Sequence, residues 1–311
     1  MNGKGCEGCA PLPPETDGVE TRFSDETGDS QTTVYPVFPG IRLKYNDAHM
    51  LSCHSEGDAT GQLLEITHCR EGRVEFAQGD EFCYLTAGDL AVTPTPVVGR
   101  DSCFPMRHYH GITVSIRLDV APACLSCLLQ DVNVRPQNLY RRFCENGSCY
   151  IARSDPRIEH IFSELYSVPP SIRCGYYKVK VLELLLFLST LDTAKNETPT
   201  HTVSQTQVEL ARRISLYLSE HMETRVTIDM LSRTFHVSGT GIKNCFRAVY
   251  GVPLYTYIRT QKMQTAAYML RRGDLSVLEI AGRVGYDNGS KFAGAFRDIM
   301  GVTPLEYRNG E

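Results

Sequence analysis

The chain has 311 residues, room for about two domains of ordinary size, and 42% of them are hydrophobic and 22% charged, as in a globular protein. Its net charge of only −4, taken over the whole chain, argues against a nucleic-acid partner. The N-terminus, MNGKGCEGCA, lacks the apolar segment of a secretory signal. The longest apolar run, residues 181–191, is shorter than the about 20 residues of a membrane-spanning helix. These features predict a soluble, cytoplasmic protein.

Residues 1–33 are rich in Gly, Pro, Asp, Glu, Ser and Thr and predict a mobile tail. The 12 cysteines of the whole chain make up about 4% of it, below the roughly 8–10% of a disulfide scaffold. Two C-x-x-C pairs, Cys6/Cys9 and Cys124/Cys127, are too far apart for a shared zinc site, whose ligand pairs usually lie about 12–20 residues apart. We expect free, mostly buried thiols.

Residues 34–120 have the pattern of short strands. In RVEFAQGDEFCYLTAGDLAVTP, apolar or aromatic residues lie two apart and are interrupted by Gly-Asp pairs that suit turns. The segment GITVSIRLDV is a further alternating, β-branched run. Several short strands at close spacing predict a small barrel or sandwich.

Residues 121–191 have a helical pattern. One predicted helix places Ile158, Ile161 and Phe162 on a single face, and the next, residues 176–191, has a broad apolar surface. Such a surface needs a partner, either within the chain or across a dimer. Residues 192–204, DTAKNETPTHTVS, have almost no hydrophobic groups and predict a linker.

The region after the linker is basic and its helix signals are clear. Residues 205–311 have 14 Lys and Arg against 10 Asp and Glu, whereas residues 1–204 have 18 against 26. A basic C-terminal third on an acidic body is compatible with a DNA-binding domain joined to a regulatory domain. SQTQ (204–207) and SVLE (276–279) are both capping boxes, in which a serine begins a helix and a Gln or Glu reaches back to it.

A duplication follows these capping boxes. FRAVYGVPLYTY, residues 246–257, returns as FRDIMGVTPLEY, residues 296–307. Each copy completes a helix, turn and helix, and a helix of about 20 residues, near 30 Å at about 1.5 Å per residue, connects the two. That length is close to one turn of DNA, about 34 Å, so two such units can read successive major grooves of one duplex.

Residues 204–308 resemble the DNA-binding domain of the AraC/XylS family of bacterial transcription regulators. The segments that carry the resemblance are MLSRTFHVSGTGIKNCFRAVYGVPLYTYIRTQKM and VLEIAGRVGYDNGSKFAGAFRDIMGVTPLEYR. The resemblance implies a DNA-binding domain at 205–308 with two helix-turn-helix units. It implies promoter DNA and RNA polymerase as partners, and a homodimer. One departure is Ser232, where the family usually has Ala.

By the same resemblance, specific side chains would contact DNA. Bases would be contacted by Thr240, Lys243, Asn244, Ser290 and Lys291, and the DNA backbone by Arg247 and Arg297. Asn can pair with adenine and Lys with guanine. The second helix otherwise has small residues at its groove-facing positions, so we expect the first helix to perform most of the direct base readout.

Residues 34–120 look like the cupin-type sensor barrel of that family, and residues 121–191 like its helical dimerisation segment. The implied fold class is α+β, with an N-terminal cupin-like β-barrel and a C-terminal all-α domain. A barrel of this kind can hold one small-molecule effector. Candidate ligand-binding residues are Glu65, His68, Arg70, His108 and Tyr109.

The histidines of the strand region raise the alternative of a cupin-type metal enzyme with a helical appendage. His108 and His110 form an H-x-H pair, with His49, His54 and His68 elsewhere among the strands. No Glu follows the pair at the spacing of metal-binding cupins, so we expect packed or pocket-lining histidines, no metal, no cofactor and no enzyme activity. A second alternative is a constitutive DNA-binding protein whose barrel only dimerises.

Overall fold

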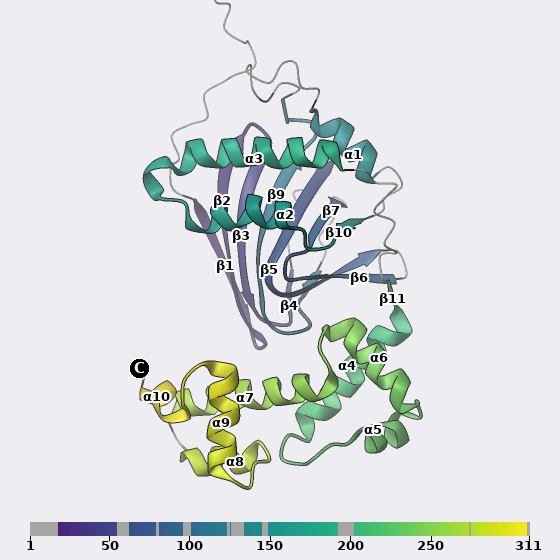
Figure 1. Ribbon diagram of the computed structural model, residues 1–311, viewed down its shortest axis with the longest axis vertical. Helices are drawn as coiled ribbons and strands as arrows, with labels where there is room; N and C mark the ends of the chain where they lie inside the picture. Colours follow the sequence, from purple (N-terminus) through teal and green to yellow (C-terminus); the bar gives the residue numbers. More distant parts are fainter. Residues whose placement is uncertain are drawn as a thin grey trace, which may run out of the picture. The chain divides into compact units, whose positions relative to one another are not determined.

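The computed structural model of the chain describes residues 18–54, 62–78, 81–95, 101–122, 125, 134–144, 149–191, 202–273 and 275–309. The chain divides into two compact units, Met1–Thr202 and Val203–Glu311, and each has its own fold (Figure 1). The paired cysteines of the two C-x-x-C motifs lie outside the described residues, as does most of the predicted linker, residues 192–201.

The first unit is built on an antiparallel sheet. Neighbouring strands follow the order β1-β2-β3-β9-β5, and the long strand β5 then pairs with β7 along its first part and with β6 along its last. The short strands β4 and β8 pair with each other, and β10 pairs with β7. The strands are β1 (Val19–Asp25), β2 (Gly28–Phe38), β3 (Ile41–His49), β4 (Ser52–His54), β5 (Leu63–Gln78), β6 (Glu81–Thr86), β7 (Leu90–Thr95), β8 (Asp101–Cys103), β9 (Tyr109–Arg117) and β10 (Tyr150–Ala152).

The predicted tail differs from the structure. Within residues 1–33, only 1–17 lie outside the described part, whereas β1 and the start of β2 form a hairpin paired in register from Asp25 and Gly28 to Val19 and Val34. All seven residues of β1 are exposed. Because β1 buries no face, its residues can be polar, as in a tail. Its strand structure comes from backbone pairing with β2.

The predicted barrel is not confirmed, because the sheet is open. In the described part of the chain, β1 has a strand partner on one side only, and no pairing closes the sheet across it. Closure of a barrel requires a partner for every strand at a consistent stagger. The charged side chains of Glu20, Arg22 and Asp25 on β1 are of the kind that protects an open edge from further pairing.

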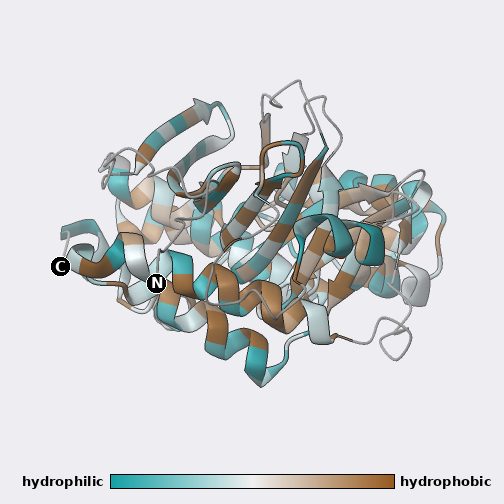
Figure 2. Ribbon diagram, turned by 90° about the horizontal axis from the view of Figure 1, so that it is seen from above, coloured by the Kyte–Doolittle hydropathy of each residue, from teal (hydrophilic) through white to brown (hydrophobic). Residues whose placement is uncertain are grey.

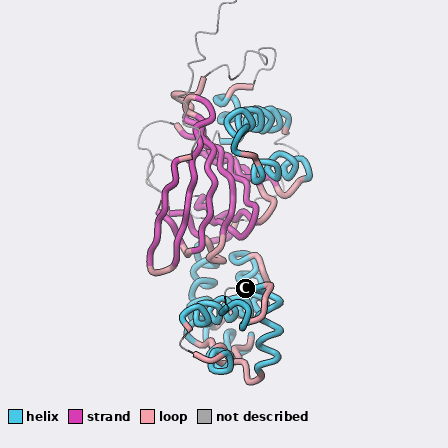
Figure 3. Tube along the Cα trace, turned by 90° about the vertical axis from the view of Figure 1, so that its left-hand side faces the viewer, coloured by secondary structure: helices cyan, strands magenta, loops and turns pink. Residues whose placement is uncertain are grey.

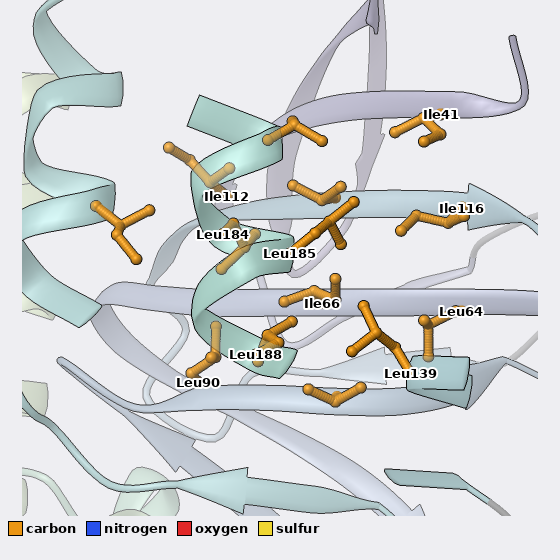
Figure 4. Close-up of a cluster of buried hydrophobic side chains, with 14 of the residues drawn as sticks. Ile41, Leu64, Ile66, Leu90, Ile112, Ile116, Leu139, Leu184, Leu185 and Leu188 are labelled. Carbon is orange, nitrogen blue, oxygen red and sulfur yellow. The ribbon is translucent and has the colours of Figure 1, made fainter. Parts of the chain in front are cut away.

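Helices cover one face of this sheet (Figures 1 and 3). They are α1 (Pro136–Cys144), α2 (Pro156–Ser163), the 3-10 helices η2 (Glu164–Ser167) and η3 (Pro170–Ile172), and α3 (Arg173–Thr190). On α3, Leu184, Leu185 and Leu188 are at most 1% exposed and point towards the strands (Figure 4). They meet the strand residues Ile66 and Ile112 in one buried cluster. The broad apolar face of residues 176–191 therefore finds its partner within the chain, and its burial does not require the predicted dimerisation.

The second unit is helical after the two-residue strand β11 (Val203–Ser204), which ends the predicted linker. Its helices are α4 (Gln205–Glu220), α5 (Ile228–Phe235), α6 (Gly239–Tyr250), α7 (Leu254–Arg272), α8 (Val277–Arg283), α9 (Gly289–Met300) and α10 (Pro304–Asn309). Polar and apolar residues are interspersed along the ribbons (Figure 2), and none of the described helices in either unit is long and apolar enough to cross a membrane.

Local sequence signals determine the ends of these helices. Both predicted capping boxes are present: the Ser204 hydroxyl accepts from the Gln207 amide at 3.4 Å, and Ser276 from Glu279 at 3.2 Å. At the other end, α6 stops at Gly251 with φ 76° and α9 at Gly301 with φ 81°. Glycine adopts this left-handed conformation without the steric cost that a Cβ brings.

Candidate functional site

Helices α5 and α6 meet at a tight turn. His236 has φ 55°, and the Ser232 hydroxyl donates to the Val237 carbonyl at 2.6 Å. A Cβ on Gly239 would lie 2.8 Å from Ile228, so glycine allows the two helices to approach closely. The hydroxyl of Ser232 thus satisfies a carbonyl of the turn, which gives a structural reason for its departure from the expected Ala.

Helix α6 has one buried and one exposed face. Ile242, Cys245, Phe246 and Val249 are at most 3% exposed, as the sequence predicted. The predicted DNA-contacting residues on this helix all lie on the exposed face, at the i, i+3, i+4, i+7 spacing that aligns side chains along one stripe: Thr240, Lys243, Asn244 and Arg247.

Helices α8 and α9 repeat this arrangement. The turn contains Gly285 with φ 73°, and Asn288 caps α9 by accepting from the Lys291 amide at 2.9 Å. Phe292 and Phe296 are fully buried in a cluster with α7 and α8. The other face of α9 exposes the residues predicted to contact DNA: Ser290, Lys291 and Arg297.

The duplicated sequence has a packing explanation. In the first copy, Phe246 meets Tyr257 at 4.9 Å between ring centroids with the planes 75° apart. In the second copy, Phe296 meets Tyr307 at 5.5 Å and 77°. In the first copy this edge-to-face contact packs α7 against α6, and in the second copy it packs α10 against α9. The repeated Phe, Gly and Tyr therefore preserve one geometry in two places.

The five predicted ligand-binding residues do not form one site. Along a strand, side chains alternate between faces, so Glu65 and Tyr109 point away from the helix-covered face that His68 shares with Ile66. Glu65 instead forms an ion pair with Lys44 at 2.9 Å. Tyr109 is 4% exposed and stacks on Phe104 at 5.3 Å, in a second apolar cluster.

His68 lies in the interior of the first unit. Its ring stacks on Phe162 at 4.3 Å and is 2% exposed, with Glu159 at 3.7 Å from Nε2. Burial lowers the pKa of His68 to about 4, and the nearby Asp89 opposes this shift. Within the described residues neither ring nitrogen has a hydrogen-bond partner. Its low pKa and its burial indicate that the His68 ring is neutral at pH 7 and packs against Phe162.

Arg70 and His108 lie near the exposed end of the same sheet. The Arg70 guanidinium covers the Tyr166 ring at 4.4 Å. The His108 Nδ1 lies 3.4 Å from the Nδ1 of His49, and His110 is adjacent to both rings. Burial, then the charges of His110 and His49, lower the pKa of His108. The sequence contains all three histidines but has no signal, short of strand register, that would place His49 beside the H-x-H pair.

The second unit is similar in sequence to known regulatory proteins. A helix-turn-helix domain family matches residues 231–310. The F1 operon positive regulatory protein of Yersinia pestis is 33% identical over 93 residues, which are 30% of this chain and 31% of that protein. The HTH-type transcriptional regulator ExsA of Pseudomonas aeruginosa is 26% identical over 143 residues, 46% of this chain and 49% of that one. Among solved structures, the C-terminal domain of AraT, a response regulator from Geobacillus stearothermophilus, is 29% identical, with 33% of this chain and 85% of that chain covered and a TM-score of 0.32.

The low TM-score adds no weight, so the assignment rests on the domain match and the sequence relatives. The chain covers less than half of the length of both relatives, 31% and 49%. Both are named as regulators, and the alternative of a cupin-type enzyme gains no support from them. Residues 231–310 of the C-terminal unit thus match a helix-turn-helix domain family, and the relatives of this unit are named as regulators, in agreement with the resemblance to the AraC/XylS family.

Proposed function

We propose that the chain is a sequence-specific, DNA-binding transcription regulator of the AraC/XylS type. The observation that carries this proposal is the exposed stripe of Thr240, Lys243, Asn244 and Arg247 on α6, backed by a fully buried opposite face within a domain of this family. An α-helix fits the major groove of B-DNA, and three or four side chains on one stripe are what such a helix uses to read base edges.

Helices α6 and α9 contact DNA in different ways. On α6, Lys243 and Asn244 have the donor and acceptor groups that pair with guanine and adenine. On α9, Ser290 and Lys291 are the polar groups near the helix start, and a Cβ placed on Gly294 would have no heavy atom within 4 Å. A helix with such small residues lets its backbone come close to DNA and favours readout of groove shape over base edges. Arg247 and Arg297, one on each helix, contact phosphates.

The remaining parts of the chain complete the regulator. The first unit receives a small-molecule effector, the chain acts as a homodimer, and the DNA-bound form contacts RNA polymerase. The names of the relatives support the regulatory role, since one is a positive regulatory protein and the other a transcriptional regulator. Of the five residues expected from sequence to bind the effector, Glu65 and Tyr109 point away from the face that His68 shares with Ile66, so the five do not line one site.

The test is selection of bound sites from random DNA by the full chain, followed by footprinting on the selected sequence. We expect protection over two successive major grooves on one face of the duplex for each protomer. Protection of a single groove would remove α9 from the proposal. Absence of binding at low salt, where phosphate contacts are strongest, would overturn the proposed function itself.

A further inference from the structure

Three histidines lie close together: His49 ends β3, His108 directly precedes β9, and His110 is the second residue of β9. The two strands are antiparallel with Asp47 opposite His110 and Ala48 opposite Tyr109, so the next position places His49 beside His108. Side chains two apart on a strand share a face, and thus the three rings and the Asp47 carboxylate form one group on one side of the sheet. On the other side of β9, Glu71 of β5 is the register partner of His110.

The distances between the rings suit a metal ion. One ligand nitrogen from each of His49, His108 and His110 can be chosen so that all lie within 4.8 Å of one another. The Nδ1 atoms of His49 and His108 are 3.4 Å apart. Two nitrogens bound to Zn²⁺ at about 2.0–2.1 Å with a tetrahedral angle are separated by about 3.4 Å, so this pair already has the spacing of two ligands.

Carboxylates lie on the outer sides of the rings. Asp47 Oδ1 is 3.0 Å from His49 Nε2 and 3.1 Å from His110 Nε2, and Glu71 Oε2 is 3.6 Å from His108 Nε2. The contact to His110 has the distance but not the angle of a hydrogen bond, and this buried nitrogen has no hydrogen-bond partner among the described residues. Metal-binding histidines usually direct their second nitrogen to such a carboxylate, which fixes the ring and raises its basicity.

We propose that His49, His108 and His110 form a binding site for a divalent transition-metal ion of the Zn²⁺ class, with Asp47 and Glu71 orienting their rings. Imidazole ligands select Zn²⁺ and its neighbours over Mg²⁺ and Ca²⁺, which require oxygen ligands. The side chains are 49%, 34% and 31% exposed, so an ion can enter from solvent. Three protein ligands leave one tetrahedral position for water or another ligand. The site belongs to the first unit and does not depend on DNA binding.

The test is titration of the metal-free, thiol-reduced full chain with Zn²⁺ alone by calorimetry. We expect a site that the paired substitution His49→Ala and His110→Ala abolishes, and that Asp47→Asn weakens by about 10–100-fold, the usual effect of losing an orienting carboxylate. The matched control is His160→Ala, which removes an exposed histidine on α2 and should leave the titration unchanged.

Co²⁺ substitution separates this site from the cysteines. Nitrogen and oxygen ligation gives visible d–d bands without thiolate charge-transfer absorption, and we expect these bands to disappear in the paired variant. His49→Gln with His110→Gln repeats the test with polar side chains, should alanine disturb the strands, and circular dichroism of the metal-free proteins checks the fold. A Zn²⁺ titration that is the same in wild type and in both paired variants, or a Co²⁺ spectrum with thiolate bands alone, would overturn the proposal.

Discussion

At the scale of single residues, the exposed stripe of α6 contains two kinds of groups. Asn244 has a side-chain amide, which can donate and accept at once and so matches a base edge, whereas Arg247 has a charge that any phosphate attracts. Both residues are exposed on the same helix. Their substitution should therefore affect binding in different ways, although neither change touches the buried face.

We expect Asn244→Ala to weaken the free energy of binding to the preferred DNA site by about 1–3 kcal/mol and to relax specificity at one base pair. The loss follows from leaving one base edge without its partner, while other positions are still read. Fluorescence anisotropy against a panel of single-base variants measures it. A uniform loss across the panel would show that Asn244 does not read a base.

Arg247→Ala and Arg297→Ala should weaken binding to all sequences alike and reduce the slope of log affinity against log salt by about one each. The matched control is Lys178→Ala, which removes a positive charge from the exposed side of α3. Salt titrations of anisotropy provide the slopes. A changed sequence preference in Arg297→Ala would contradict the division between backbone and base contacts.

The buried environment of His68 should make the stability of the first unit depend on pH. Its folded pKa of about 4 lies below its ordinary value of 6.5, so the unfolded chain binds the proton more readily between these values. We therefore expect the contribution of His68 to stability to be greatest above pH 6.5 and to decrease by up to about 3 kcal/mol as the pH falls to 4. Without the charge of Asp89, which favours the protonated ring, the pKa of His68 would be lower still.

The measurement is urea unfolding of wild type and His68→Phe between pH 4 and 7. Phenylalanine keeps the ring contact with Phe162 and removes the titrating group. The stability difference between the two proteins should therefore change in favour of the variant as the pH falls. A difference that is constant with pH would show that the pKa of His68 is the same in the folded and unfolded states.

At the scale of elements, glycine favours stability where the backbone is left-handed, just after a helix, and lowers it where the backbone is helical. Gly301 ends α9 with φ 81°, where a Cβ is strained whatever space surrounds it. Gly282 lies in the last turn of α8 without a left-handed φ, and a Cβ there would have no heavy atom within 4 Å. Replacing each glycine with alanine therefore tests the effect of backbone conformation, because the added Cβ contacts no other atom at either position.

We expect Gly301→Ala to destabilise the second unit by about 1–2 kcal/mol. Its matched control, Gly282→Ala, should stabilise the same unit by up to about 1 kcal/mol, because alanine is more favourable than glycine where the backbone is helical. Thermal unfolding followed by circular dichroism measures both. Equal effects of the same sign would mean that the stop at Gly301 does not depend on its left-handed conformation.

At the scale of the whole molecule, the chain is two compact units with separate apolar clusters. Leu185 of α3 is fully buried against the sheet in the first unit, and Phe296 of α9 is fully buried in the second. Each truncation removes contacts in one cluster only. Their effects should therefore appear in different unfolding transitions.

Calorimetry of the full chain should show two transitions. Leu185→Ala should destabilise the first unit by about 2–5 kcal/mol, and Phe296→Ala the second by about 3–5 kcal/mol, through lost burial and the cavity left behind. Each variant should leave the other transition in place. A single transition that both substitutions lower together would show that the units unfold as one.

The helical unit was largely predictable from sequence. Its apolar residues repeat at helical spacing, and its helix ends depend on neighbours within a few residues, as at Ser204, Ser276, Gly251 and Gly301. The duplication predicted two similar helix pairs, and the Phe–Tyr contacts explain why these residues recur. The roles of the exposed residues in reading DNA stay predictions.

The first unit was less predictable, because its structure depends on contacts between distant segments. The β1–β2 hairpin is polar and has no apolar alternation that would separate it from a tail. Strand alternation predicts which side chains share a face with Glu65 or Tyr109. It does not predict which face of the sheet the helices cover, and a ligand site cannot be placed without that information.

By itself, therefore, the sequence determined the features that are local: helix starts and stops, the buried stripes of α6 and α9, and the helix-turn-helix character of the second unit. Only the tertiary structure decided that the sheet is open, that α3 packs within the chain, and that His49 lies beside His108. The physical reason is that strand register joins residues far apart in the chain, and a shift of one position would turn each of those side chains to the other face.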